Sequence, residues 1–217
     1  MFIRFTLLAI TVLLYSCSAA TEPRGNSPPV KKEAVKNAIN IAKGILSNER
    51  LMTEIPAGWA KIRDSKLASL HIAEYVPPDT TTKWTEKLTI EAMQGDDLPD
   101  PLVVLEGLAR DQAELCEGFK SEPIFAGYEN GYQTVVKLLI CYENTRTGKP
   151  IVTMIKSIRG NSSFYTVSRF WRIDKPPAED EDLDIDQGAI AAWSNILSKT
   201  YACDSSVSEH PCKQPAA

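Results

Sequence analysis

The chain has 217 residues, of which 43% are hydrophobic and 24% are charged, a composition typical of a globular protein and not of a disordered one. Its formal net charge of −4 gives no basis for binding the phosphates of nucleic acid, so no nucleic-acid partner is expected. The length favours a single domain, and after the N-terminal segment no apolar run approaches the roughly 18 residues of a membrane-spanning helix.

Residues 1–16 have the features of a signal peptide that ends at a lipidation site. Arg4 gives a positive start, and residues 5–15 form an apolar run that is too short to span a bilayer core of roughly 30 Å. Residues 14–17, Leu-Tyr-Ser-Cys, resemble the bacterial lipobox, in which the cysteine is acylated, with palmitate among the chains, and becomes the new N-terminus. We therefore predict lipidation of Cys17 and location in a bacterial cell envelope, in the outer membrane facing the periplasm or the surface.

Four further cysteines agree with an oxidising compartment: Cys116, Cys141, Cys203 and Cys212. An even number in an exported chain predicts two disulfides, for which three pairings are open. The pairs Cys116–Cys141 and Cys203–Cys212 are favoured, because each closes a short loop and neither loop crosses the other. Buried free thiols are the alternative, and no Cys-x-x-Cys pattern indicates a metal site.

The first half of the mature chain predicts one helix and three strands. Residues 17–30 are rich in Ser, Ala, Pro and Gly and predict a flexible tether, so that residues 31–217 form a single α+β domain with a disulfide-pinned tail. A helix is predicted over 31–47 from apolar residues at helical spacing. The strands are expected at 59–62, at 68–76, where Pro77-Pro78 stops it, and at 84–93, with Trp84, Leu88, Ile90 and Ala92 facing inward.

The second half predicts a helix, four strands and a last helix. The first of these helices is expected over 101–117, capped by Asp100, with Leu102, Leu105, Leu108 and Leu115 as its buried stripe. Strands follow at 121–128, 132–143, 151–158 and 163–173, joined by short turns such as Asn130-Gly131. An acidic connection over 174–186 leads to a helix at 185–199, which directs Ile190, Trp193, Ile196, Leu197 and Tyr201 toward the sheet.

This order of elements predicts an α+β fold with one antiparallel sheet of six to seven strands packed by helices. The layout resembles bacterial secreted proteins and lipoproteins of the PsbP-like α/β sandwich type. The residues that carry this resemblance are Trp59, Glu74-Tyr75-Val76-Pro77, Trp84-Thr85-Glu86, Cys116, Tyr132, Cys141, Gly148, Lys156, Gly160 and Tyr165. The resemblance implies a binding or assembly module and supplies no catalytic residues.

Candidate catalytic and metal-ligating residues are few. His71 lies within a predicted strand without a nucleophile motif, which favours a structural histidine, and His210 in the tail is expected to be exposed to solvent. The alternating acids at 180, 182, 184 and 186 invite a calcium hypothesis, but an EF-hand turn would need glycine where Gln187 stands. A solvated linker whose last acid caps a helix is the better interpretation, so neither a metal nor another cofactor is expected.

Aromatic side chains are unusually dense in the strand at 163–173. Alternation places Phe164 and Phe170 on one face, and Tyr165 and Trp171 on the other. Tyr165 and Trp171 form a possible binding surface if helices cover one face of the sheet, and all four belong to the core if helices cover both.

The sequence as a whole favours a lipid-anchored, non-catalytic module that binds another envelope protein, with the membrane as a second partner. The alternatives are an envelope hydrolase with an unrecognised site that uses His71, and a small-ligand carrier with an apolar cavity between sheet and helices.

Overall fold

The computed structural model describes residues 48–78, 80, 85–174 and 186–212, which all belong to a compact unit covering residues 34–217. The predictions for residues 1–47, which include the signal peptide, lipidation at Cys17, the tether and the first helix, lie outside the described residues. The same holds for Trp84 and for the acids at 180, 182 and 184.

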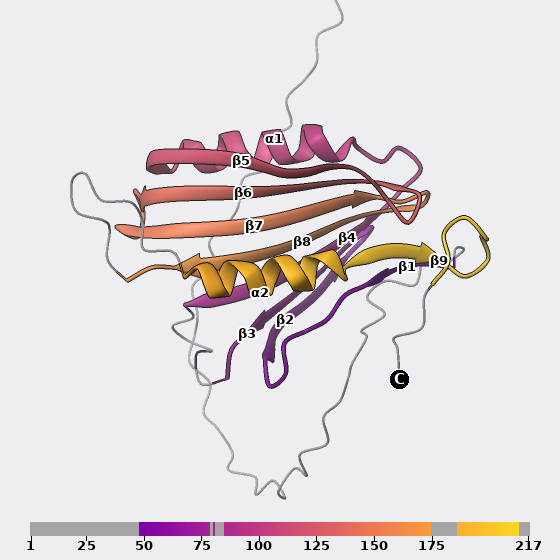
Figure 1. Ribbon diagram of the computed structural model, residues 1–217, viewed down its shortest axis with the longest axis horizontal. Helices are drawn as coiled ribbons and strands as arrows, with labels where there is room; N and C mark the ends of the chain where they lie inside the picture. The colour runs from indigo at the N-terminus through magenta and orange to yellow at the C-terminus, as the bar shows by residue number, and fades with distance from the viewer. Residues whose placement is uncertain (1–47, 79, 81–84, 175–185, 213–217) are drawn as a thin grey trace, which may run out of the picture. The chain divides into compact units, whose positions relative to one another are not determined.

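The described residues form two helices, a seven-stranded antiparallel sheet and a two-stranded sheet (Figure 1). The large sheet has the order β2-β3-β4-β8-β7-β6-β5, and the small one joins β1 to β9. The elements are β1 (Glu49–Met52), β2 (Ala60–Leu67), β3 (Leu70–Val76), β4 (Glu86–Gln94), α1 (Pro101–Ala113), β5 (Cys116–Glu129), β6 (Tyr132–Asn144), β7 (Lys149–Arg159), β8 (Ser163–Arg172), α2 (Gln187–Ser198) and β9 (Tyr201–Asp204). The predicted fold class is confirmed.

Tight turns explain why β5 to β8 form a meander. Asn130 and Gly131 have φ values of +50° and +81°, which suit the two-residue turn that matches the twist of a hairpin. This turn sets β5 against β6 in the register Glu129↔Tyr132, and β6, β7 and β8 follow in sequence order. The meander then closes onto β4, so β8 lies in the interior of the sheet with neighbours on both sides.

The two edge strands are longer than predicted. β2 runs over Ala60–Leu67 where 59–62 is expected, and β5 runs over Cys116–Glu129 where 121–128 is expected. Most side chains of both strands are exposed or half-buried, so neither strand shows the alternation of apolar and polar residues on which a sequence prediction depends. Pairing with the neighbouring strand determines their length instead.

Helix α1 begins where predicted and ends four residues earlier. The Asp100 carboxylate accepts a hydrogen bond from the Leu102 amide at 2.7 Å, and Pro101 takes the first helical position, where its missing N–H is not needed. The helix stops at Ala113 because Cys116 already pairs with Asn144 as the first residue of β5.

The buried stripe of α1 differs from the prediction. Leu105 and Ala109 are buried, whereas Leu102 and Leu108 are 45% and 39% exposed. Positions four residues apart form a narrow stripe, and this stripe packs on Val135, Leu139 and Ile155 of the sheet. The two exposed leucines lie beside this narrow contact.

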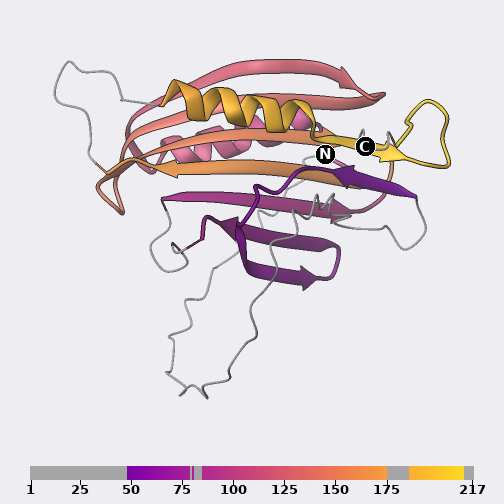
Figure 2. The same cartoon turned by 60° about the horizontal axis from the view of Figure 1, so that its bottom comes forward.

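Helix α2 lies on the opposite face from α1, as Figures 1 and 2 show. Asp186 caps it by accepting a hydrogen bond from the Gly188 amide at 2.8 Å, as predicted. Trp193 and Leu197 are buried in the larger core cluster. Side chains of the sheet in that cluster include Leu88, Ile90, Val136, Met154, Ile158, Tyr165 and Val167.

The small β1–β9 sheet was not predicted. Each of its strands has four residues, and its antiparallel register runs from Glu49↔Asp204 to Met52↔Tyr201. Leu51 and Ala202 from its two strands are fully buried in the cluster that also holds Trp193. The chain therefore brings the first described strand and the last one together over the α2 face of the sheet.

Candidate functional site

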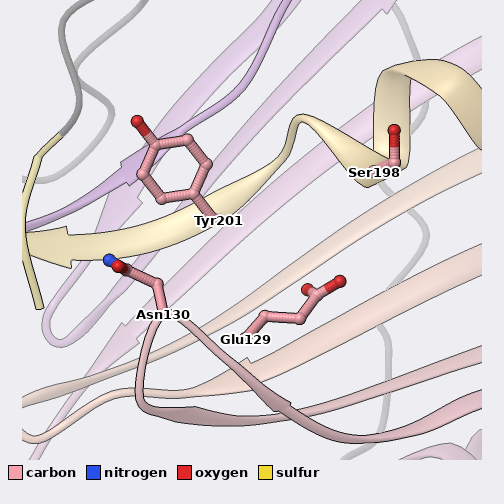
Figure 3. Close-up of a pocket in the computed structure, with 4 residues that line it drawn as sticks. All are labelled: Glu129, Asn130, Ser198 and Tyr201. Atoms are coloured by element: carbon pink, nitrogen blue, oxygen red, sulfur yellow. The ribbon is translucent and has the colours of Figure 1, made fainter.

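A pocket of about 290 Å³ lies where the β5–β6 hairpin meets the end of α2 and the start of β9 (Figure 3). Four residues line it: Glu129, Asn130, Ser198 and Tyr201. Two segments that are far apart in the sequence, 129–130 and 198–201, supply these residues, so only the folded chain forms this pocket.

A buried lysine lies behind the Glu129 carboxylate. The side chain of Lys156 is 1% exposed, and its ammonium is 2.5 Å from Oε2 of Glu129 and donates a hydrogen bond to the Leu197 carbonyl at 2.7 Å. Burial lowers the pKa of Lys156 because it disfavours the charged form, and the Glu129 carboxylate opposes this shift. The pair joins β7 to the β5–β6 hairpin and to the C-terminal end of α2.

The side chain of Asn130 is held by the tail. Its amide nitrogen donates hydrogen bonds to the Ala202 carbonyl at 2.9 Å and to the Pro211 carbonyl at 3.2 Å. Nδ1 of His210 lies 2.9 Å from the Asn130 carbonyl, and it must donate because a carbonyl can only accept. The Cys203–Cys212 disulfide closes the loop that carries these contacts.

His210 is half-buried, in contrast to the exposed position predicted for it. Its ring stacks on Tyr132 with the ring centroids 4.2 Å apart and an interplanar angle of 29°. A Cβ atom added to Gly131 would approach the His210 ring to 2.3 Å, so the hairpin can only close under this ring with glycine at that position. The tail is packed onto the hairpin by these contacts.

Ser198 ends α2 at the rim of the pocket. Its hydroxyl donates a hydrogen bond to the Asn195 carbonyl at 2.8 Å. No Lys, His or carboxylate is hydrogen-bonded to this hydroxyl among the residues that the structure describes, so the pocket has no activated serine. Figure 3 shows Glu129 and Asn130 on the hairpin, with Ser198 and Tyr201 on the segment above them.

A second cluster surrounds Arg169 on the same face of the sheet. The guanidinium of Arg169 lies 4.3 Å from the ring centroid of Trp171 and 4.1 Å from that of Trp193, with Trp59 at 5.6 Å, and it forms an ion pair with Glu86. Burial lowers the pKa of Arg169 to about 10, and the Glu86 charge opposes the shift. The Arg169 cation thus lies against the rings of three tryptophans from β8, α2 and the segment before β2.

The prediction that Tyr165 and Trp171 form a binding surface is wrong for Tyr165. Tyr165 is 0% exposed, because α2 and the β1–β9 sheet cover this face of β8. Trp171 is half-buried and meets Trp193 edge-on at 6.3 Å, in addition to its contact with Arg169. Helices cover both faces of the large sheet, which is the case in which these aromatics belong to the core.

His71 is hydrogen-bonded within the sheet, as a structural histidine should be. Its Nε2 lies 2.7 Å from Oδ1 of Asp64, and Oδ2 of the same carboxylate accepts a hydrogen bond from Lys61 at 2.8 Å. These two hydrogen bonds, first that of Lys61 and then that of His71, lower the pKa of Asp64 to about 2. No serine, threonine or cysteine is hydrogen-bonded to His71 within 48–78, 80, 85–174 and 186–212.

Both favoured disulfides are present, Cys116–Cys141 and Cys203–Cys212. In the described part of the chain, no three or more His, Cys, Asp or Glu residues are grouped so that they could hold a metal ion. No helix within that part is long and apolar enough to cross a membrane.

The pocket residues were missed because no motif marks them. One signal was available: Lys156 stands in the middle of the apolar strand Ile-Val-Thr-Met-Ile-Lys-Ser-Ile, at a position where alternation places it beside Met154 and Ile158. A lysine is almost never fully buried unless it is paired. Its inward position therefore predicts a partner, but not that the partner is Glu129.

Comparison with known proteins shows no match to a family model and none to a curated protein. Among solved structures, a single-residue mutant of the protein Mog1 has a TM-score of 0.49 at 14% identity, covering 72% of this chain and 92% of that chain. LpqN, described as involved in cell envelope biogenesis of Mycobacterium tuberculosis, has a TM-score of 0.45 at 15% identity, with 76% and 89% covered. The Saccharomyces cerevisiae Ran-binding protein Mog1p has a TM-score of 0.44 at 13% identity, with 72% and 92% covered. We take neither function nor site residues from likenesses at this level.

Proposed function

We propose that this chain is a lipid-anchored bacterial envelope protein whose folded body is a non-catalytic binding module. The observation that carries the proposal is the pocket at the β5–β6 hairpin, where side chains from two distant segments meet and those of Glu129 and Asn130 are held in place by structural contacts. Such preorganisation favours binding, because little conformational entropy remains to be lost when a ligand arrives.

The envelope location follows from the sequence and the cysteines. Residues 1–16 with Cys17 predict export and acylation, and two disulfides are typical of an oxidising compartment. Two or more acyl chains on Cys17 would hold the protein on the membrane, since each buried methylene contributes about 0.8 kcal/mol. We place the protein in the outer membrane, with another envelope protein as partner.

Binding is favoured over catalysis by the state of the polar groups at the pocket. The Ser198 hydroxyl donates to a main-chain carbonyl, and Lys156 is paired with Glu129 behind the pocket. A nucleophilic mechanism needs a hydroxyl or thiol in contact with a base, and the described residues at the pocket lack that pair.

Membrane fractionation tests the anchoring. The wild-type chain should sediment with membranes and be released only by detergent, whereas a Cys17→Ala variant should remain in the signal-bearing, unacylated form and lose the lipid mass. Mass spectrometry of the N-terminal peptide measures this directly. An unmodified Cys17 in the wild-type protein would overturn the anchoring part of the proposal.

Cross-linking in intact cells tests the binding part. A Ser198→Trp variant fills the pocket with a large side chain, and Ala192→Trp adds the same side chain at an exposed position of the same helix as the matched control. The proposal expects a specific cross-linked envelope protein that Ser198→Trp removes and Ala192→Trp retains. Equal retention in both variants would place binding elsewhere than the pocket.

A hydrolase is the second candidate, favoured by the Asp64–His71 hydrogen bond between β2 and β3. A carboxylate that orients a histidine is part of several hydrolytic sites. If the soluble body hydrolyses an ester or peptide substrate and His71→Gln abolishes this activity without lowering the melting temperature, the hydrolase replaces the binding module as the leading function.

A further inference from the structure

The polar groups that line the pocket are mainly acceptors, because their donors are already used. Both amide hydrogens of Asn130 are donated to the Ala202 and Pro211 carbonyls, so its Oδ1 is the polar atom left for a ligand. The Ser198 hydroxyl donates to Asn195, which leaves the lone pairs of its oxygen. Asn130 and Ser198 therefore favour a ligand that brings hydrogen-bond donors.

The charges around the pocket favour a cation. The Glu129 carboxylate is 30% exposed and uses Oε2 for Lys156, so its second oxygen is available at the pocket. The pocket also lies at the C-terminal end of α2, where the helix dipole places partial negative charge. Lys199 follows that helix, but its ammonium lies 3.9 Å from the Glu54 carboxylate.

We propose that the pocket binds a primary ammonium group carried by a small polar molecule, with Glu129 as its counter-ion and the oxygens of Asn130 and Ser198 as further acceptors. An ammonium has three donors and no acceptor, which matches this set of groups. The volume of about 290 Å³ is at the small end of the range for ligand pockets and fits one sugar ring or one side chain. This inference rests on the proposed function and names the ligand class of the same pocket.

An ammonium can come from an amino sugar or from a lysine side chain of a peptide, and two probe pairs separate these sources. The first pair is glucosamine and N-acetylglucosamine, and the second is Nα-acetyl-lysine amide and the same molecule acetylated at Nε. Within each pair, acetylation removes the charge of the amine and adds one acetyl group, so the double variant described below serves as the control for the added size. Binding is measured by calorimetry and by ligand-observed NMR on the intact chain in a non-ionic detergent.

Two variants move the affinity in opposite directions. Glu129→Gln removes the counter-ion and should weaken ammonium binding about tenfold or more, because a charge-assisted hydrogen bond becomes a neutral one. Lys156→Met removes the competing cation behind the pocket and should strengthen binding by about two- to fivefold. A merely structural defect would weaken binding in both. The Leu197 carbonyl keeps its hydrogen bond from the Thr200 amide in Lys156→Met.

Two further variants control for folding. Glu122→Gln changes a carboxylate that is 44% exposed on the same strand, paired with Lys120 and outside the pocket lining, and it should bind like wild type. The double variant Glu129→Gln/Lys156→Met removes both charges together and avoids an unpaired buried lysine, so it should fold even if Glu129→Gln does not. It should bind the charged and the neutral member of each pair equally.

The outcomes separate this inference from the proposed function. Preference for the charged member of one pair, with opposite effects of the two single variants, supports the inference and identifies the source. If neutral probes bind as tightly as charged ones and Ser198→Trp abolishes both, the pocket still binds and the ammonium assignment is overturned. If no probe binds at millimolar concentration while Ser198→Trp removes the cross-linked partner, the inference fails and the binding module remains.

Discussion

Helices α1 and α2 pack on opposite faces of the same sheet, yet the two faces are built differently. Under α1, a cluster of five buried apolar residues makes the contact. The buried cation Lys137 on this face reaches the exposed Glu106 of α1 itself. The α2 face holds a larger cluster together with buried charges that include Glu49, Lys156 and Arg169.

Each of these three buried charges joins segments that are far apart in the sequence. Glu49 accepts hydrogen bonds from the Asn161 and Ser162 amides, more than one hundred residues later. Lys156 connects β7 with the end of α2, and Arg169 connects β8 with β4 and α2. A buried charge costs free energy unless it is paired, so these partners select one arrangement of the elements. Burial of apolar side chains stabilises the α1 face. On the α2 face, the pairing of buried charges also fixes which segments pack together.

The largest effects should come from the cores themselves. Trp193→Ala should lower the free energy of unfolding by about 3–5 kcal/mol, and Leu105→Ala by about 2–5 kcal/mol, through lost burial and the cavities left behind. Because the two residues lie in separate clusters, the double variant should be additive within about 0.5 kcal/mol. Urea unfolding measures all three. A coupling well above that value would show that the two faces do not act independently.

Removing a disulfide should have the next largest effect on stability. Replacing Cys203 and Cys212 by serine should cost about 2–4 kcal/mol, because the unfolded chain regains the entropy that the loop had lost. The same change at Cys116 and Cys141 is the control, since that bond lies at the opposite end of the β5–β6 hairpin from Asn130. Only the first pair should also shift the side-chain amide signal of Asn130 in NMR spectra. Equal shifts in both variants would contradict the role assigned to the tail.

Replacing a buried charge on the α2 face should lower the free energy of unfolding more than replacing an exposed charge. Glu49→Gln keeps the size of the side chain but turns an amide group toward the donors of residues 161 and 162, and it should cost about 1–3 kcal/mol. Glu122→Gln on the exposed edge should change stability by less than about 0.5 kcal/mol. Similar losses in the two variants would remove the distinction between buried and exposed charges.

The smallest effect concerns acid stability at the β2–β3 hairpin. The folded-state pKa of Asp64 is about 2, below its ordinary value of 3.8, so its contribution is full above about pH 4 and is lost as the pH falls toward 2. Asp64→Asn should flatten the fall of the free energy of unfolding in that interval. Chemical denaturation at a series of pH values measures it, and an unchanged slope would show that folding does not lower the pKa of Asp64.

Local patterns allowed the α1 side of the molecule to be predicted. Asp100 and Pro101 mark the helix start, Asn130-Gly131 marks the hairpin, and short turns separate the strands β6, β7 and β8. These signals depend on residues within a few positions of one another. The prediction failed where no local pattern exists. The exposed edge strands show no alternation, and the side of α1 that is buried depends on its narrow contact with the sheet.

The candidate site was not predictable in the same way. The α+β class, an antiparallel sheet of six to seven strands and the favoured cysteine pairs were predictable from the sequence, because periodicity, turn residues and loop length are local properties. The burial of Tyr165, the pairing of β1 with β9 and the contact of Glu129 with Lys156 beside a pocket became visible in the folded chain. Those contacts join distant segments, and their free energy exists only after the chain has folded.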